Sequence, residues 1–294
     1  MIDSQQNDDE KPSTDRMKNS SYLFLPTSLF WRVNRELLIN LAGGRALLLE
    51  LAHPLVATGV AQHSGFQQHP FRRLWRTMQV MTQLTFGNEE ERSHALRAFH
   101  GCHKNVQGRL PKGEGRYEGG SHYHAEHPEL KLWVLATLID SALLAHEVFI
   151  SPLSPSDKQS YYEDCKPMAS LLGIPSSLRP ASYEAFQQYL DEMLESEILH
   201  VGENARQIVA ALLQPRWFRP VVQAAHFFGT GLLPERVRAM YNLRWDKNEE
   251  ERLRRLATRL QWLRAHLPSC VCVSPKASFA EWRGNWATIF ALQK

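Results

Sequence analysis

Cysteine is scarce in this sequence, and the four that occur, Cys102, Cys165, Cys270 and Cys272, are irregularly spaced. They match neither a disulfide framework nor a tetrahedral zinc motif. The pair Cys270-Val-Cys272 has a spacing that could hold a metal, but such a pair more often consists of two ordinary thiols. The cysteine pattern therefore favours a reducing compartment.

The sequence also lacks an excess of charge of one sign, because 34 basic residues face 31 acidic ones and the net charge is +3. This balance gives no reason to expect a nucleic-acid partner. Residues 1–20 are polar and contain no apolar core of a signal peptide. We expect a disordered N-terminal tail there, and a cytoplasmic protein that either stays in solution or lies at the periphery of a membrane.

No long uninterrupted apolar run is present. The longest apolar stretch, residues 36–61, is broken by Arg45, Glu50 and His53, whereas a membrane-spanning helix needs roughly 20 apolar residues with few charges. We therefore predict no transmembrane segment and interpret this stretch as a pair of buried helices. A hydrophobic content of 43% over 294 residues suffices for one large core.

Alternating strand patterns are nearly absent, and helical periodicity dominates. The sequence predicts an all-α fold with a globin-like helical core, in one domain over residues 21–268 with a C-terminal extension, 269–294, packed on it. Gly43-Gly44 should end the first helix, Pro54 should break the second, and residues 107–127 should form a glycine-rich loop. The predicted helices are 29–41, 45–63, 70–86, 88–106, 128–149, 154–173, 182–200, 203–213, 216–229, 234–243, 247–266 and, less regular, 279–290.

The helix over residues 70–86 carries apolar residues on two faces, so we expect it to be largely buried. Arg73 would then be drawn inward, where a guanidinium requires an anion. That anion is either a neighbouring Asp or Glu or the carboxylate of a ligand.

His103 shares a helix face with Leu96, Phe99 and Val106. A histidine on an apolar face is most often a hydrogen-bonded core residue, but neutral imidazole is also the commonest ligand of haem iron in helical proteins. No Cys-x-x-Cys-His motif occurs, which excludes covalent c-type haem attachment. His100, one turn earlier, competes for the same role from the polar edge of the helix.

Two further residues interrupt apolar helices. His53 lies in Leu-Ala-His-Pro-Leu-Val and could act as an acid, a base or a backbone cap beside Pro54. Asp140 follows Trp133 and Thr137 on the most apolar helix, which we expect at the centre of the bundle. An ion pair with Arg45 or Arg73 is the favoured role for Asp140, and general-base catalysis is the alternative.

The predicted loop contains His122, His124 and His127. His-x-His with a third histidine is a plausible metal clamp. The loop offers no obvious polar support for such ligands, so a physiological metal site there is the less favoured interpretation.

Taken in order, these segments resemble the catalytic domain of the MpaB-type oxygenases and rubber oxygenases (latex-clearing proteins). Any one segment is a weak match, but the ordered set covers about residues 30–200 and is fairly specific. The matching segments are Trp31-Arg-Val-Asn-Arg-Glu36, the run from Arg45 through His53 and His63 to Phe66, Arg73-Leu-Trp-Arg76-Thr77, His103 with Val106-Gln-Gly108, Trp133 to Asp140-Ser, and Leu153-Ser-Pro with Tyr161-Tyr162.

The resemblance implies a helical bundle that encloses a non-covalent haem b, with His103 as the proximal iron ligand. Arg73, Arg76 and Thr77 match an Arg-x-x-Lys-Thr element that lines the haem in rubber oxygenases. Arg76 replaces the lysine that can approach the iron there, and arginine is a poor metal ligand, so we expect an open or water-bound distal side. Two other positions depart from the pattern, Leu135 where relatives often have His and His127 where they often have Asp. We also expect cofactor contacts from residues in the other matching segments, namely Arg45, Trp133 and Thr137.

The implied activity is the oxygenation of an apolar, isoprenoid-like or alkene substrate with dioxygen, with the haem supplying the oxygen chemistry. His53 or Asp140 would assist the removal of a proton. Three alternatives remain open at this point: a haem-binding sensor or carrier without turnover, a haem-free helical protein that binds small molecules, and a metal-dependent hydrolase that uses the loop histidines.

Overall fold

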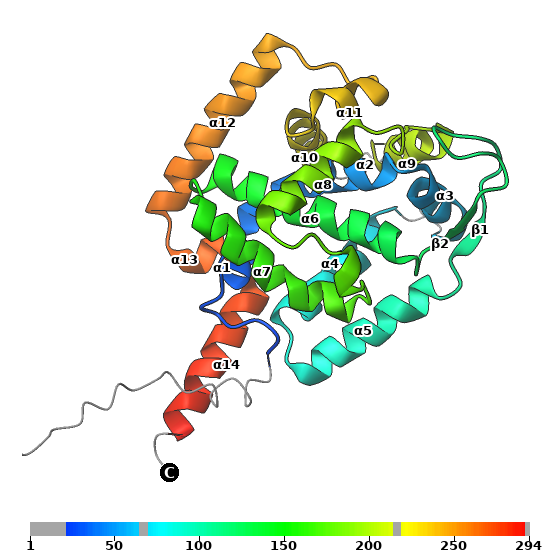
Figure 1. Cartoon of the computed structure of the whole chain (residues 1–294). Helices are drawn as coiled ribbons and strands as arrows, with labels where there is room; N and C mark the ends of the chain where they lie inside the picture. The colour runs from blue at the N-terminus through cyan, green and yellow to red at the C-terminus, as the bar shows by residue number, and fades with distance from the viewer. Residues whose placement is uncertain (1–21, 65–69, 214–218, 292–294) are drawn as a thin grey trace, which may run out of the picture.

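The computed structural model describes residues 22–64, 70–213 and 219–291, and the predicted N-terminal tail lies outside these ranges. Within them the chain forms a helical bundle around α6 (Pro128–Phe149), as Figure 1 shows. The helices that precede α6 are α1 (Leu29–Asn34), the 3-10 helix η2 (Leu37–Ala42), α2 (Gly43–Leu51), α3 (Pro54–His63), α4 (Pro70–Phe86) and α5 (Glu89–His103). After α6 come α7 (Pro155–Leu171), η3 (Ser176–Leu178), α8 (Tyr183–Glu195), α9 (Glu203–Leu213), α10 (Arg219–Gly231), α11 (Glu235–Met240), α12 (Lys247–His266), α13 (Ser269–Cys272) and α14 (Pro275–Ala291).

The central position of α6 confirms the sequence prediction. Side chains on all sides of this helix are buried, among them Trp133, Ile139 and Phe149. Its length and a mean hydropathy of 1.5 over 18 residues would also suit a membrane span, but 61% of that window is buried inside the protein. We interpret α6 as the core helix of the bundle.

Several helix boundaries coincide with capping residues in the sequence. Asn88 and Glu91 form a reciprocal capping box at the start of α5, and Ser154 and Asp157 form another at the start of α7. Gly173 adopts a φ of +72° just after α7, a left-handed conformation that glycine adopts without strain. The break at Pro54 is also present, since α2 ends at Leu51 and α3 begins at Pro54.

The glycine pair Gly43-Gly44 does follow the end of a helical stretch, since Gly43 is the C-cap of η2, but it also begins α2 without an intervening loop. The predicted helix 29–41 is instead split into α1 and η2. A Cβ on Gly44 would lie 2.7 Å from the carbonyl oxygen of Ala225 in α10, whereas a Cβ on Gly43 would meet nothing within 4 Å. Gly44 therefore permits a close crossing of α2 and α10. This tertiary requirement cannot be predicted from the neighbouring residues in the sequence.

Helix α4 is more exposed than its two apolar stripes predicted. The side chains of Leu74, Trp75 and Met78 are 40%, 61% and 42% exposed. The residues of the other stripe are the buried ones, since Leu84 is fully buried and Val80 packs on the main core. One side of α4 thus faces the protein and α5, and the other has no covering element among the described residues.

The predicted loop 107–127 contains a short antiparallel hairpin, which the sequence analysis missed. Strand β1 (Gln107–Arg109) pairs with β2 (His122–His124), with Gly108 opposite Tyr123. A Cβ on Gly108 would lie 2.7 Å from the hydroxyl oxygen of Tyr123, so glycine makes room for the ring. Strands of three residues with no apolar alternation leave no periodic signal to detect.

The C-terminal segment packs on the start of the chain. Glu281 in α14 accepts a hydrogen bond from the indole of Trp31 at 2.7 Å and pairs with Arg35 at 3.0 Å. Arg264 near the end of α12 forms a two-pronged ion pair with Glu36, at 2.6 and 2.7 Å. In Figure 1, α12 (orange) runs along one side of the bundle and α14 (red) projects away from it.

Candidate functional site

His103 occupies the last turn of α5 and is partly buried. Its Nδ1 lies 2.7 Å from the carbonyl oxygen of Phe99, one turn earlier, and the two rings are 4.2 Å apart. A carbonyl oxygen only accepts, so Nδ1 carries the proton and Nε2 keeps its lone pair. Burial lowers the pKa of His103 from its usual value, which favours the neutral imidazole that can bind a metal.

The competing histidine, His100, makes a different contact. Its Nδ1 lies 3.2 Å from a carboxylate oxygen of Glu126, which also forms an ion pair with Lys131. His100 is therefore engaged in a polar cluster at the surface. The backbone bond of His103 is the type of second contact that orients a ligating imidazole.

Arg73 connects α4 with the residues around His103. Burial lowers the pKa of Arg73, and Glu50 in α2 opposes this shift. The charge of Arg73 also acts on the pKa of His103 and of Cys102. Arg73 in α4 is therefore coupled by charge to Glu50 in α2 and to Cys102 and His103 in α5, and Glu50 is an acidic neighbour of the kind that the sequence required.

Glu50 is the functional candidate that sequence reasoning missed. Burial raises the pKa of its carboxyl group to about 7, although the charge of Arg73 works in the opposite direction. In the sequence, Glu50 interrupts the apolar run Leu47-Leu-Leu-Glu-Leu-Ala. A lone carboxylate in such a run was itself the available signal, because a buried carboxylate requires a partner or a shifted pKa.

Arg76 and Thr77, which the resemblance assigns to the cofactor, have exposed side chains on α4. The charge of Arg76 acts on the pKa of Cys102, so it lies at the edge of the same cluster. Trp133 and Thr137 are buried in α6. The indole of Trp133 donates to the carbonyl oxygen of Leu49 at 3.2 Å, next to Glu50 in the chain.

Arg45 and Asp140 form a separate buried pair. Nη2 of Arg45 lies 2.5 Å from a carboxylate oxygen of Asp140. Its other nitrogens donate to Ser141 at 2.7 Å and to the carbonyl oxygen of Leu232 at 2.9 Å. The favoured interpretation of Asp140 as an ion-pair partner is confirmed, and the partner is Arg45.

His53 takes part in a third group of contacts. It is buried, and its Nε2 is 3.2 Å from the hydroxyl of Tyr117 in the hairpin. Burial and, to a smaller extent, Arg116 lower the pKa of His53 to about 4. Its Nδ1 has no hydrogen-bond partner among the described residues. His53 is therefore a neutral core histidine at physiological pH, with Tyr117 as its hydrogen-bond partner.

The three loop histidines do not form a metal clamp. No group of three or more His, Cys, Asp or Glu side chains in the described ranges could hold a metal ion. Nδ1 of His124 accepts a hydrogen bond from the backbone of Glu126 at 3.0 Å, and His122 and His127 are exposed. All four cysteines are free of disulfide bonds.

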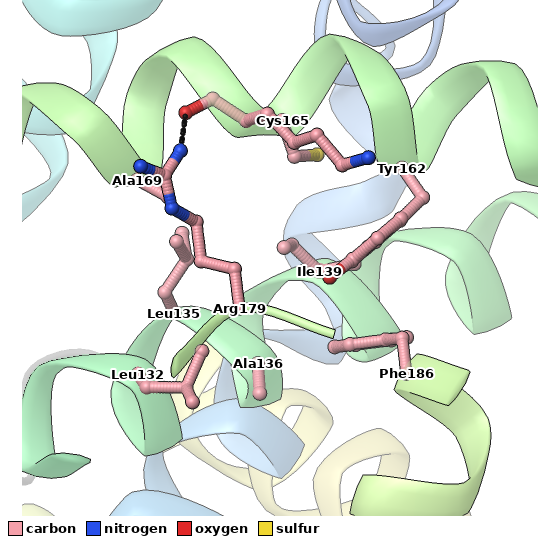
Figure 2. Close-up of a pocket in the computed structure, with 10 residues that line it drawn as sticks. Leu132, Leu135, Ala136, Ile139, Tyr162, Cys165, Ala169, Arg179 and Phe186 are labelled. Atoms are coloured by element: carbon pink, nitrogen blue, oxygen red, sulfur yellow. Dashed lines mark hydrogen bonds between the residues drawn. The ribbon is translucent and has the colours of Figure 1, made fainter. Parts of the chain in front are cut away.

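A small void lies elsewhere, between α6, α7 and the start of α8. Figure 2 shows it among Leu132, Leu135, Ile139, Cys165 and Phe186, with Arg179 at its edge. Its volume of about 20 Å³ is close to that of one water-sized sphere. It is too small for a cofactor or an organic substrate, and none of the residues predicted for the site lines it.

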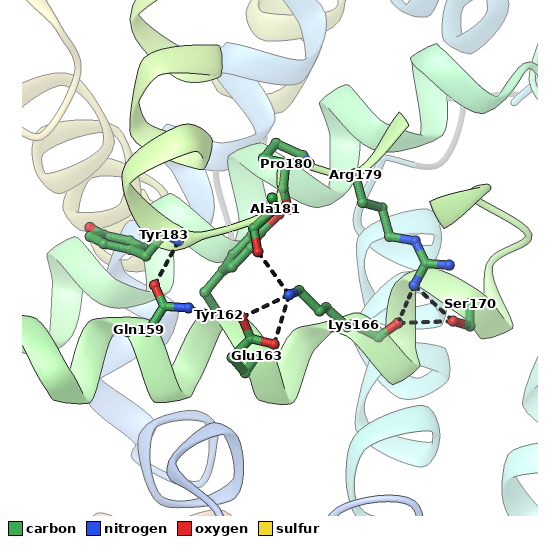
Figure 3. Close-up of polar contacts among 9 residues, drawn as sticks. All are labelled: Gln159, Tyr162, Glu163, Lys166, Ser170, Arg179, Pro180, Ala181 and Tyr183. Carbon is green, nitrogen blue, oxygen red and sulfur yellow. Dashed lines mark hydrogen bonds and ion pairs between the residues drawn. The ribbon is translucent and has the colours of Figure 1, made fainter. Parts of the chain in front are cut away.

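The polar contacts beside this void are structural. Figure 3 shows that Arg179 donates to Ser170 and to the carbonyl oxygen of Lys166, while Lys166 pairs with Glu163 and donates to the carbonyl oxygen of Ala181. These bonds tie the segment before α8 to α7. The group around His103, Arg73 and Glu50 therefore remains the candidate site: it combines a neutral imidazole, a partly buried cation and a carboxyl group with a pKa of about 7.

Comparison with known proteins points to one family. Residues 31–262 match the family described as "ER-bound oxygenase mpaB/B'/Rubber oxygenase, catalytic domain". Two curated relatives, the uncharacterised proteins Mb2261 of Mycobacterium bovis and Rv2237 of Mycobacterium tuberculosis, are each 27% identical over 227 residues, covering 73% of this chain and 86% of theirs. No solved structure matches this chain.

Proposed function

We propose, since this chain belongs to the family of mpaB/B' and rubber oxygenase catalytic domains, that it is a haem-b-dependent oxygenase acting on an apolar alkene with dioxygen. The observation that carries the proposal is the state of His103. Its Nδ1 proton is bound by the Phe99 carbonyl at 2.7 Å, which leaves the Nε2 lone pair for an iron.

The residues around His103 fit a haem. A haem is an apolar ring system with two carboxylates, so its site needs an axial ligand, apolar walls and a cation. Leu96 and Phe99 in α5 and Val80 and Met81 in α4 pack on the main core but are only partly buried. Part of their apolar surface is therefore available for contact with a haem. Arg73 supplies a partly buried cation.

His103 and Arg73 would hold the group from α5 and α4. When bound, haem b supplies the activation of dioxygen, and the protein sets ligation, access and polarity. Because Arg76 stands where the family's rubber oxygenases have lysine, we propose that no side chain of α4 ligates the iron.

Glu50 is the residue that we propose for proton transfer, in place of His53 and Asp140. Its pKa of about 7 lets the carboxyl group accept or release a proton near neutral pH. Asp140 is committed to Arg45, and His53, with a pKa of about 4, is bonded to Tyr117. The charge of Arg73 would stabilise the carboxylate form of Glu50 once it has lost its proton.

The cofactor is tested by an absorption spectrum of the protein expressed with ample haem precursor. We expect a haem-b Soret band in the wild type and in His100→Ala, and loss of the haem in His103→Ala. His100 lies on the same helix one turn away, so it is a matched control. A flat visible spectrum that added hemin does not change would exclude the oxygenase and leave a haem-free helical protein.

Turnover is tested separately from haem binding. With an isoprenoid alkene such as squalene as the probe, we expect oxygen consumption by the wild type. Glu50→Gln should keep the Soret band and lose activity by roughly 100-fold, the usual weight of a general base. A haem-loaded wild type that consumes no oxygen with squalene or with shorter alkenes would favour the sensor or carrier instead.

A further inference from the structure

The uncovered side of α4 presents three apolar side chains, Leu74, Trp75 and Met78, which we call the α4 face. They are 40%, 61% and 42% exposed, and their spacing of one and four residues places them on one side of the helix. An exposed tryptophan next to two exposed aliphatic side chains is unusual for a surface that meets only water.

The charged side chains on α4 itself are all of one sign. Arg72 and Arg76 are exposed beside it, and the sequence of α4, Pro70–Phe86, contains no Asp or Glu. The surface is therefore apolar with a basic flank, which complements a negatively charged, partly apolar partner.

The opposite side of α4 explains why this face stays outside. Arg73 turns inward to Glu50, and Val80 and Leu84 pack on the core. Helix α4 thus has two apolar sides. A buried stripe packs against the protein, while the α4 face, with its arginines, points away from it. A basic amphipathic helix with Trp and Leu on its apolar side is the type that lies in a membrane interface.

We propose that the α4 face docks on the surface of an anionic lipid membrane, with Trp75 at the headgroup level and Arg72 and Arg76 on lipid phosphates. The proposal stands without the haem, because it uses only exposed residues. Arg73 lies on the inner side of the same helix, so the docked face would be separated from His103 and Glu50 by α4 alone.

Other exposed apolar side chains fit a membrane less well. Trp262 on α12 is 60% exposed, but its ring stacks on His266 at 4.4 Å. Helix α12 also carries Glu249, Glu250 and Glu251 among its basic residues, whereas α4 has no acidic residue. Phe279 and Trp282 on α14 stack on each other, and Arg283 lies over the Phe279 ring.

The test is sedimentation of the full chain with vesicles of phosphatidylcholine alone or with 30% phosphatidylserine, about the anionic content of a charged leaflet. We expect binding to the anionic vesicles only. Arg72→Glu should weaken it by roughly fivefold or more, from one lost phosphate contact, and Trp75→Glu by about tenfold. Trp262→Glu, at an equally exposed tryptophan, and Arg254→Glu with Arg259→Glu on α12 should leave it unchanged.

Three outcomes would overturn the proposal: no binding of the wild type to anionic vesicles, equal binding of the α4 variants, or loss of binding in the α12 variants instead. A concentration-dependent dimer that Trp75→Glu dissociates would show that a second copy covers the α4 face. Because all these residues are exposed, the variants should fold, and an unchanged circular dichroism spectrum checks this. The haem spectrum of each variant is recorded alongside, so that failure here is distinguishable from failure of the oxygenase.

Discussion

Arg45 and Asp140 are held 2.5 Å apart between α2 and α6, and the same guanidinium also bonds Ser141 and the carbonyl oxygen of Leu232. One side chain therefore ties the central helix to α2 and to the end of α10. The guanidinium is almost fully buried, so it has exchanged its hydration for these three partners.

Removal of this guanidinium should be costly. We expect Arg45→Met to lower the free energy of unfolding by about 3 kcal/mol, because it leaves Asp140 without its counter-ion in a largely buried place. Urea denaturation followed by circular dichroism measures the change. The control is Arg255→Met, whose ion pair with Glu251 is 3.6 Å long with an arginine side chain that is 65% exposed, and which should change stability by less than about 0.5 kcal/mol. Equal effects of the two substitutions would contradict the buried-pair interpretation.

The neighbouring glycines Gly43 and Gly44 should respond in opposite directions to alanine. A Cβ at Gly44 would lie 2.7 Å from the carbonyl oxygen of Ala225 and 3.3 Å from the Cα of Gly229, both in α10. Gly44→Ala must push α2 and α10 apart, and we expect a loss of about 2–3 kcal/mol. Gly43→Ala meets nothing within 4 Å in a helical position, so it should be neutral or stabilise by up to about 1 kcal/mol. Thermal unfolding of both variants measures these changes in stability. A Gly44→Ala variant as stable as the wild type would refute the close crossing.

The contrast between these glycines shows what the sequence could and could not predict. Helix existence, the Asn88 and Ser154 caps and the break at Pro54 were readable because they depend on neighbours in the chain. The role of Gly44 was not, since it depends on α10, some 180 residues later in the chain. The hairpin of β1 and β2 was missed for a related reason: its strands are too short to carry a period.

The candidate site divides in the same way. His103 and Arg73 were found because each stands out on an apolar helix face. Glu50 was missed because its importance comes from burial and from Arg73 on another helix. The exposure of Trp75 could not be foreseen either, because periodicity shows that a stripe is apolar but not what covers it.

His53 should make the folded state depend on pH in acid. Its pKa falls from 6.5 to about 4 on folding, so the unfolded chain binds the proton more readily. The stabilisation from neutral His53 is complete above about pH 6.5 and is lost as the pH falls towards 4, an effect on the order of 3 kcal/mol. His53→Asn should remove this part of the pH dependence of the unfolding free energy, whereas His94→Asn, at an exposed histidine, should not. An unchanged slope in His53→Asn would mean that His53 is accessible to protons in the folded state.

Glu50 should act in the opposite direction over nearly the same range. Burial raises its pKa from 4.5 to about 7, so the folded protein keeps a proton that the unfolded chain has lost. The contribution of protonated Glu50 is complete below about pH 4.5 and disappears as the pH rises to 7, roughly 2–3 kcal/mol in all. In the wild type the slopes from Glu50 and His53 largely cancel. Glu50→Gln should therefore expose the slope from His53, with stability rising by about that amount from pH 4.5 to 6.5, and Glu118→Gln at an exposed position should leave the profile as in the wild type. Unfolding free energies at several pH values in the haem-free protein test this, and a Glu50→Gln profile identical to the wild type would remove Glu50 as the buried carboxyl group of the site.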